Sequence, residues 1–330
     1  MKILTVTSEW PTPTSPGRVP FLVQRIKYLR REGVETKVFF FRGNKNPLNY
    51  LAAHRCLRRK YDLRQFDVVH AHFGQSGLVT LPSPRPVVVT FYGSDLQGIV
   101  TPSGSYSWKG IASRELGRMI ARQATKVVVV ARRLAEYLPS EVSPEVIPCG
   151  VDRELFFPVP RTEARARLGW SQEKRVVLFA ADPRRPVKRY KLAQESISRV
   201  PALGEVELCV LADVPHEQVP WYMNASDALV LTSRHEGSPT VVREALACDL
   251  PVVSVDVGDV RESVHGIDGC HVCEEASPGC IARALSRVLG PRRRVDGRPA
   301  AAVYDEKRLA QKLISLYRAA QSVTRRPEDA

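Results

Sequence analysis

Short apolar runs separated by amphipathic stretches recur along the whole chain. Between residues 2 and 131 the apolar runs are KILTVTS, ETKVFFF, FDVVHAH, RPVVVTFYG and TKVVVVA. Between residues 174 and 273 they are KRVVLFA, VELCVLA, DALVLTS, LPVVSVD and GCHVC. Several of the stretches between them, such as PFLVQRIKYLRREG, have the apolar spacing of helices. Runs rich in β-branched residues that alternate with helices predict parallel sheets built from βαβ units.

The two series of apolar runs are separated by residues 145–160, EVIPCGVDRELFFPVP. Prolines at 148, 158 and 160 interrupt any regular element and mark this stretch as a linker. A chain of 330 residues is also longer than one compact core usually supports. We therefore expect an α/β protein of two doubly wound, Rossmann-like domains that face each other across a cleft, with a boundary between residues 150 and 151.

The composition restricts where such a protein works. No apolar run approaches the roughly 20 residues that a bilayer-spanning helix needs. The N-terminus MKILTVTSEW lacks the charged region and apolar stretch of a secretion signal. Seven cysteines at irregular spacing indicate reduced thiols. These features predict a cytoplasmic protein.

The net charge of +14 is concentrated in the first half of the chain. Residues 1–150 contain 22 Lys and Arg against 10 Asp and Glu, and the remainder contains 27 against 25. VQRIKYLRREG and HRCLRRKYDLR are expected to be basic helices, which suit an anionic membrane face or an acidic acceptor. A solvated basic surface explains any single cluster equally well. With 7% aromatic residues and no recognised nucleic-acid module, no nucleic-acid partner is expected.

Several motifs of nucleotide and metal chemistry are missing from the sequence. It has no G-x-G-x-x-G after a strand, no G-x-x-x-x-G-K-[ST] and no D-x-D. Cys270, Cys273 and Cys280 lie close together, but the first two belong to an apolar strand whose alternate positions face opposite ways. We expect buried structural cysteines there rather than a zinc site, and no metal elsewhere.

The segment EGSPTVVREALA places two carboxylates around the start of a helix. Glu236 lies in the turn after the strand DALVLTS; Ser238 suits an N-cap and Pro239 the first helical position of a helix through residues 240–247. Free N–H groups and the positive end of the helix dipole favour a phosphate there. Glu244 lies about a turn and a half inside the helix, where its carboxylate suits a diol such as a ribose. For Glu244 alone, a solvated helix glutamate is the simpler interpretation.

A second basic cluster follows the strand KRVVLFA. Arg184, Arg185 and Lys188 lie in a proline-stiffened turn at the carboxyl end of that strand, which is the ligand side of a parallel sheet. Their cations suit a diphosphate and the charge that develops on it as a leaving group. Surface solubility is the alternative explanation.

Residues 226–262 resemble the signature of glycosyltransferase family 4, retaining enzymes of the GT-B fold. The E-x7-E motif of that family matches Glu236 and Glu244. VIPCGVD resembles the family's I-P-N-G-V-D linker with Cys149 in place of Asn, and RRPVK resembles a compressed R-x4-K-G in which Arg189 follows Lys188. FDVVHAH and VVTFYGSDL resemble acceptor-domain strands. A helix at about 305–322 resembles the one that packs back on domain 1–150, which leaves 151–304 as the donor-binding domain. The match extends over nearly the whole chain.

The resemblance implies transfer of a sugar from a nucleotide-diphosphate sugar to a hydroxyl acceptor, with retention and without a metal or other cofactor. The acceptor is expected to be a sugar, a polymer or a lipid-linked molecule in polysaccharide, cell-envelope glycan or glycolipid synthesis, which allows peripheral contact with the cell membrane. The residues implied on the donor side are Glu244 for the ribose, Arg184 or Arg185 with Lys188 for the diphosphate, Glu236 for the sugar hydroxyls, Gly237, Ser238, Pro239 and Thr240 for the donor anchor, and Gly17 for close approach of the backbone to the phosphates.

On the acceptor side, Tyr92 stands where many relatives carry a histidine. A tyrosine donates a hydrogen bond but does not titrate near neutral pH. His72, Ser94 and Asp95 are candidates to share that role, although a structural histidine at a strand end explains His72 equally well. Two other functions remain open from the sequence: a nucleotide-sugar epimerase of the same fold, and a non-catalytic relative that binds nucleotide sugars.

Overall fold

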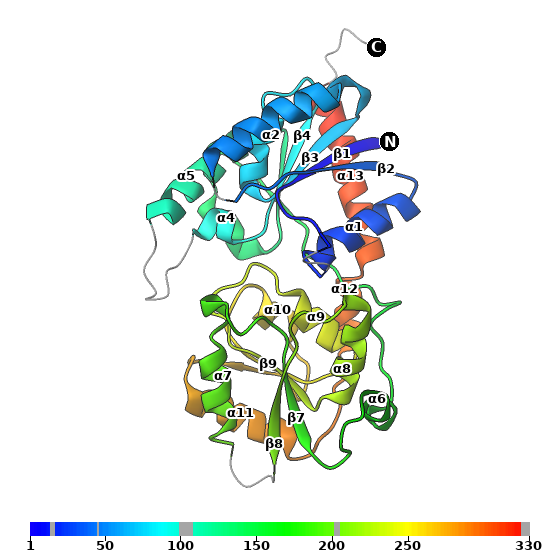
Figure 1. Ribbon diagram of the computed structural model, residues 1–330, viewed down its shortest axis with the longest axis vertical. Coiled ribbons are helices and arrows are strands. Elements are labelled where there is room, and N and C mark those ends of the chain that lie inside the picture. Colours follow the sequence, from blue (N-terminus) through cyan, green and yellow to red (C-terminus); the bar gives the residue numbers. More distant parts are fainter. Residues whose placement is uncertain (14–16, 45, 99–107, 201–204, 325–330) are drawn as a thin grey trace. The chain divides into compact units, whose positions relative to one another are not determined.

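The computed structural model describes residues 1–13, 17–44, 46–98, 108–200 and 205–324. The chain divides into two compact units, each built around one parallel sheet with helices on its faces (Figure 1). The first unit comprises residues 1–14, 18–148 and 306–330, and the second comprises 15–17 and 149–305. The fold class expected from the alternating pattern, two doubly wound α/β units, is confirmed.

The sheet of the first unit has the strand order β2-β1-β3-β4-β5-β6, with every pair parallel. One strand lies inside the segment that the prolines marked as a linker without regular elements. Glu145 and Val146 pair with Val128 and Val129, so that expectation was wrong at this end of the linker. The strands are β1 (Lys2–Thr7), β2 (Glu35–Phe40), β3 (Val68–His72), β4 (Val87–Phe91), β5 (Lys126–Val129) and β6 (Glu145–Val146).

The last helix of the chain packs on the first sheet. Leu313 and Tyr317 of this helix are buried in one cluster with Ile3 and Val68 of the sheet. Its first residue, Glu306, forms a buried ion pair with Arg25. The helices of the unit are α1 (Pro20–Arg31), α2 (Pro47–Lys60), α3 (Gly77–Thr80), α4 (Ser94–Gln97), α5 (Trp108–Gln123) and α13 (Glu306–Thr324).

The sheet of the second unit has the order β11-β10-β9-β7-β8, again all parallel. Its strands are β7 (Arg175–Phe179), β8 (Val206–Val210), β9 (Ala228–Leu231), β10 (Val252–Val255) and β11 (His271–Cys273). The helices are α6 (Arg161–Leu168), α7 (Tyr190–Ile197), α8 (Val219–Ala225), α9 (Thr240–Ala247), α10 (Val260–Ser263), α11 (Pro278–Leu289) and α12 (Arg298–Val303).

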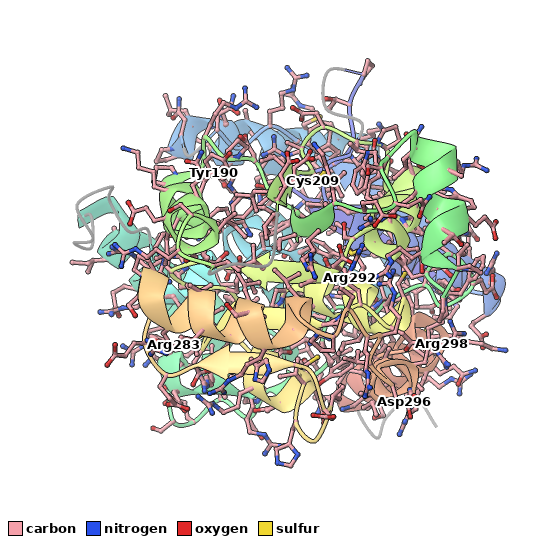
Figure 2. The ribbon with its side chains drawn as sticks, turned by 90° about the horizontal axis from the view of Figure 1, so that it is seen from below. Tyr190, Cys209, Arg283, Arg292, Asp296 and Arg298 are labelled. Carbon is pink, nitrogen blue, oxygen red and sulfur yellow. The ribbon has the colours of Figure 1, made fainter. Side chains whose placement is uncertain are left out.

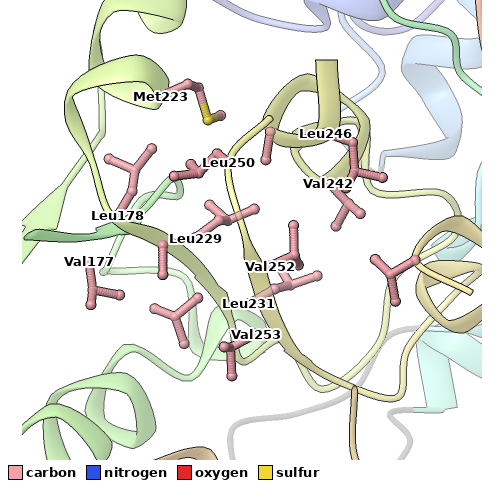
Figure 3. Packing of buried hydrophobic residues seen from close by; sticks show 14 of the residues in the cluster. Val177, Leu178, Met223, Leu229, Leu231, Val242, Leu246, Leu250, Val252 and Val253 are labelled. Atoms are coloured by element: carbon pink, nitrogen blue, oxygen red, sulfur yellow. The ribbon is translucent and has the colours of Figure 1, made fainter. Parts of the chain in front are cut away.

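The core of the second unit explains the continuous apolar runs in its sequence. Val177, Leu229 and Val253 come from neighbouring central strands and are buried, with Met223 and Leu246 from helices packed in the same cluster (Figure 3). A parallel sheet covered on both faces buries side chains in both directions, so its strands lack the alternation of a half-exposed sheet.

One buried carboxylate holds the amino end of this sheet. Asp227, directly before β9, accepts hydrogen bonds from Arg161 (2.6 Å) and from Arg165 (2.8 Å). It also accepts hydrogen bonds from the amide of Val176 (2.8 Å) and from Arg292 (3.2 Å), which is labelled in Figure 2. The fully buried Arg165 has no other carboxylate partner among the described residues, so one aspartate neutralises a cation in the core.

We expect Asp227→Ala to destabilise the second unit by about 3–5 kcal/mol, because it leaves the buried Arg165 guanidinium without its counter-charge. The matched control is Glu163→Ala, an exposed carboxylate on α6, which should change stability by less than about 0.5 kcal/mol. Urea unfolding of the two variants and the wild type measures the difference. Equal unfolding midpoints for both variants would contradict this role of Asp227.

Candidate functional site

The strand order of the second sheet has a topological switch point between β7 and β9. β7 and β9 are neighbours, but β8 lies on the other side of β7, so the chain leaves the carboxyl ends of β7 and β9 in opposite directions. Ligands of doubly wound sheets bind at such switch points. The segments that begin there are residues 180–189 and 232–239, which contain the predicted basic turn and the first predicted glutamate.

The two segments bring Lys188 and Glu236 together. The ammonium of Lys188 lies 2.5 Å from Oε1 of Glu236, and each side chain is 17% exposed. Two further hydrogen bonds join the loops. The amide of Arg234 donates to the carbonyl of Val187 (2.8 Å), and the Thr232 hydroxyl donates to the carbonyl of Lys188 (2.8 Å). A cation and an anion are thus fixed side by side at the ligand edge of the sheet.

Arg189 occupies the position where the family pattern has glycine. Its backbone is left-handed (φ 50°, ψ 52°), a conformation that glycine adopts without cost. Here the side chain has partners instead: the guanidinium donates to the carbonyl of Thr232 (2.6 Å) and to that of Ser233 (3.1 Å). The arginine therefore ties this turn to the end of β9. In the sequence, this role of Arg189 was indicated by the presence of arginine where the family pattern has glycine.

The two arginines of the predicted diphosphate cluster do not join Lys188 in this structure. Arg184 is 76% exposed and pairs with Asp182 (2.9 Å) and, more distantly, with Asp213 (3.8 Å). Arg185 is exposed. Of these three cations, only Lys188 forms a described side-chain ion pair with another predicted site residue; Arg185 meets Lys188 through the backbone, where its carbonyl accepts from the Lys188 amide (2.9 Å).

The start of α9 differs from the expected capping. The helix begins at Thr240 with Pro239 at the N-cap position, so the prediction of Ser238 as N-cap and Pro239 as first helical residue was wrong by one position. The Ser238 hydroxyl accepts from Arg243 (2.6 Å) and donates to Asp259 (3.0 Å), which diverts it from the helix amides. Among the described residues no side chain caps the first turn. The amide of Val242 donates to the carbonyl of Pro239 (3.2 Å), so the amides left at the helix end are those of Thr240 and Val241.

A buried arginine explains why Ser238 is diverted. Arg243 is fully buried, forms an ion pair with Asp259 and donates to the carbonyl of Cys149 (2.8 Å). Its guanidinium lies 4.0 Å from the centre of the Tyr304 ring. A buried cation needs hydrogen-bonded partners, and these partners fix the glycine turn before α9 against the loop after β10.

Gly258 was not among the site residues expected from the sequence. It has φ 56°, and a Cβ placed on it would lie 2.7 Å from the carbonyl oxygen of Gly237 and 3.2 Å from Cδ of Pro239. The loop after β10 therefore approaches the turn before α9 so closely that only glycine fits. A glycine three residues after the end of the buried strand β10 was the available signal.

Glu244 is not a solvated helix glutamate. It is 8% exposed, and its Oε1 lies 3.1 Å from Nε2 of His216, which follows β8. Burial opposes protonation of His216, but the hydrogen bond and charge of Glu244, with the charges of Glu217 and Asp152, raise its pKa above the usual value. The sequence analysis did not single out His216.

The first sheet also has a switch point, between β1 and β3, and His72 ends β3 there. Nδ1 of His72 lies 2.7 Å from the Tyr92 hydroxyl, and its ring centre is 3.9 Å from that of His70. His70 in turn contacts Tyr317 (2.6 Å) and Thr90 (2.7 Å). Burial, with the charge of Arg25, lowers the pKa of His70 to about 3. Burial and the neighbouring His70 also lower the pKa of His72 well below its usual value.

The remaining acceptor-side candidates have different settings. Asp95 is buried and accepts hydrogen bonds from the amides of Gly74 (2.9 Å), Gly93 (2.8 Å) and Tyr92 (3.1 Å). Burial raises the pKa of Asp95 against these amide bonds. Its carboxylate therefore holds the loop after β4. Ser94 begins α4, and its side chain lies outside what the structure describes; Gly17 lies in the turn before α1.

Neither a metal cluster nor a membrane-spanning helix is found in the described parts of the chain. No three His, Cys, Asp or Glu side chains gather there in a way that could hold a metal ion. Cys270, Cys273 and Cys280 are free thiols. No described helix combines the length and the apolar character that crossing a bilayer requires.

The two units match two family models in sequence. Residues 5–155 match the model described as Glycosyltransferase Family 4, and residues 163–291 match Glycosyl transferases group 1. Both models describe glycosyltransferases, and between them they cover most of the chain, so the resemblance to glycosyltransferases of the GT-B fold is confirmed. It is 27% identical to the putative teichuronic acid biosynthesis glycosyltransferase TuaC of Bacillus subtilis, over 87% of this chain and 89% of that protein.

Solved structures share the fold at low sequence identity. Sucrose-phosphate synthase from Thermosynechococcus elongatus superposes with a TM-score of 0.79 at 17% identity, covering 98% of this chain and all of that one. Anabaena HepE in complex with UDP-glucose superposes with a TM-score of 0.69 at 17% identity, covering 97% of this chain and all of that one.

We expect Gly258→Ala to weaken binding of a nucleoside diphosphate at least tenfold, because the new methyl group displaces the turn at Gly237. Gly169→Ala is the matched control: Gly169 has φ 68° but nothing within 4 Å of an added Cβ. That control should lose about 1 kcal/mol of stability from backbone strain and keep its affinity. Calorimetric titration measures both, and equal affinities would show that the Gly258–Gly237 contact does not shape the site.

Proposed function

We propose that the chain transfers a sugar from a nucleotide-diphosphate sugar to a hydroxyl acceptor, in polysaccharide, cell-envelope glycan or glycolipid synthesis. The observation that carries the proposal is the meeting of Lys188 and Glu236 at the switch point of the second sheet. The second glutamate of the family motif, Glu244, lies in the helix that begins at the same sheet edge. The two glycosyltransferase models and the name of TuaC support transfer over the epimerase and the non-catalytic alternatives, and the complex of HepE with UDP-glucose supports a nucleotide-sugar ligand.

The donor site is proposed to work by electrostatics. Breaking the bond between sugar and diphosphate leaves negative charge on the diphosphate and positive character on the sugar. Lys188 would stabilise the leaving group, with the open amides at the start of α9 as further donors. Glu236 would hold sugar hydroxyls while its own charge is balanced by Lys188. Arg184 and Arg185 remain candidates for the diphosphate, reached by rotation of exposed side chains.

Retention and independence of a metal are part of the proposal. In the mechanism that the family resemblance implies, the acceptor hydroxyl attacks from the side of the leaving group, with the diphosphate as base. Lysine and helix amides are a source of positive charge that needs no divalent ion. No residue of the site then has to change its protonation state during transfer.

The acceptor side is proposed to use neutral groups. Because their pKa values are lowered, His70 and His72 are uncharged near neutral pH. His72 would orient the Tyr92 hydroxyl through their 2.7 Å contact, and Tyr92 would replace the histidine of other family members. Asp95 would act indirectly, through the loop that carries Tyr92.

Lys188→Ala is expected to lower the rate of transfer by about 10²–10³, the scale of losing one preorganised donor to a developing charge. Glu244→Ala should raise the donor KM about ten- to a hundredfold, because a hydrogen bond to a charged group is worth roughly 1.5–3 kcal/mol. Lys191→Ala, an exposed lysine on α7, is the control and should behave as wild type. The measurement is release of nucleoside diphosphate with and without acceptor.

The same assay tests the chemistry by its product. The product should keep the anomeric configuration of the donor, and EDTA should leave the rate unchanged. Wild-type rates in both Lys188→Ala and Glu244→Ala would overturn the assignment of the site. An inverted product would overturn retention alone, and an altered donor sugar without acceptor would favour the epimerase.

We also propose reversible contact of the first unit with an anionic membrane surface, on the cytoplasmic side. The outward face of α2 carries Leu48 and Leu51, which are 71% and 48% exposed, followed by the exposed cations Arg55, Arg59 and Lys60. Apolar side chains next to cations suit the headgroup region of an anionic bilayer, where each cation contributes about 1 kcal/mol.

Arg55→Glu with Arg59→Glu should abolish flotation with vesicles that contain anionic lipid, and the wild type should lose flotation as salt rises. The control is Arg199→Glu with Arg293→Glu, an identical charge change at two exposed arginines of the second unit. Equal loss in both double variants would assign the binding to net charge rather than to α2. No flotation of the wild type at low salt would overturn the membrane proposal.

A further inference from the structure

His216 is not one of the predicted site residues, but it contacts Glu244, which is one of them. It belongs to the short turn η5 (His216–Gln218) after β8, and its Nε2 is 3.1 Å from Oε1 of Glu244. The two side chains are 19% and 11% exposed, so the contact is nearly closed to water. A hydrogen bond between such groups is stronger than the same bond at the surface.

The contact leaves half of the carboxylate available. Among the described residues, Oε2 of Glu244 accepts no hydrogen bond. It is also not one of the fully buried polar atoms that lack a hydrogen-bond partner. A carboxylate in the middle of a helix rotates about its own side-chain bonds unless a partner holds it. His216 is that partner, and it fixes one oxygen while the second keeps its lone pairs for a ligand.

The surroundings of His216 favour its role as a donor. The ring of Phe156 lies 5.2 Å away and limits how the imidazole tilts. The charged groups that face it are Glu244 on α9, Glu217 on its own turn and Asp152 from the segment before α6. All three groups are acidic, so their charges stabilise a proton on the imidazole. Because a carboxylate oxygen accepts hydrogen bonds, Nε2 is the donor towards Glu244.

We propose that His216 is a positioning residue that orients Glu244, so that the free carboxylate oxygen accepts hydrogen bonds from the ribose hydroxyls of the nucleotide. This inference rests on the proposed function, because it assumes that Glu244 meets a ribose. It predicts that discrimination between a ribose and a sugar without its 2′ and 3′ hydroxyls depends on His216, although His216 itself does not touch the nucleotide.

The test measures affinity by calorimetry for whichever of UDP, GDP and ADP binds the wild type most tightly, and for its 2′,3′-dideoxy counterpart. The wild type should prefer the ribonucleotide about ten- to a hundredfold, the value of a hydrogen bond to a charged group. His216→Ala should reduce that preference to threefold or less, chiefly by weakening the ribonucleotide. His216→Gln keeps an N–H donor and should restore most of it.

The pH dependence separates positioning from a merely structural role. Because the pKa of His216 is raised, it keeps its proton to a higher pH than an ordinary histidine and loses it as the pH rises further. Affinity of the wild type for the ribonucleotide should therefore fall above that pKa, as the hydrogen bond loses its charge. The profile should be flat in His216→Gln, and the dideoxy ligand corrects for ionisation of the phosphates.

The outcomes distinguish the two proposals. If the wild type binds a ribonucleotide and His216→Ala keeps its full preference for ribose, the role of His216 is overturned and the proposed function stands. If no nucleoside diphosphate binds the wild type, both are overturned. Should His216→Ala fail to fold, as judged by its thermal unfolding, the comparison of His216→Gln with the wild type across pH decides.

Discussion

The ion pair between Lys188 and Glu236 is the contact on which the account of the donor site depends. It forms because β7 and β9 are neighbours although β8 separates them in sequence, so the loops after them leave one sheet edge together. At that edge a cation and an anion stay 2.5 Å apart with little access to water. A donor with a negative diphosphate and a hydroxyl-rich sugar presents the complementary pair of groups. The charges of Lys188 and Glu236 therefore complement the diphosphate and the sugar hydroxyls of this class of ligand.

The rest of the second unit keeps that pair in place with buried charges. Asp227 neutralises Arg165 at the amino end of the sheet, and Arg243 joins Asp259, Ser238 and the carbonyl of Cys149 near the carboxyl end. Removing one partner of such a pair costs more than the pair itself contributes, because the other charge stays buried. The Arg243 network joins the turn before α9 to the loop after β10. The first unit also has a buried ion pair, between Arg25 and Glu306, but burial lowers the pKa values of its His70 and His72.

Much of the fold follows from local pattern, because alternating apolar runs and helices have few solutions once the sheets are parallel. The positions of Lys188 and Glu236 also follow, since both come after strand ends that the pattern locates, and Glu244 lies in the helix that the pattern places next. Local sequence pattern does not show which groups a side chain contacts in the folded protein. Ser238 has the chemistry of an N-cap, but a buried arginine five residues later takes its hydroxyl. His216 and Gly258 acquire their roles from residues 28 and 21 positions away in sequence. Only the folded chain brings such pairs together.

The central claim is that one nucleotide-diphosphate sugar is bound at the switch point of the second sheet. A crystal structure of the protein with a nucleoside diphosphate tests it most directly. The account predicts the diphosphate at Lys188 and the start of α9, with the ribose hydroxyls on the carboxylate of Glu244. A nucleotide bound elsewhere, with the Lys188–Glu236 pair and Glu244 free of it, would contradict the claim.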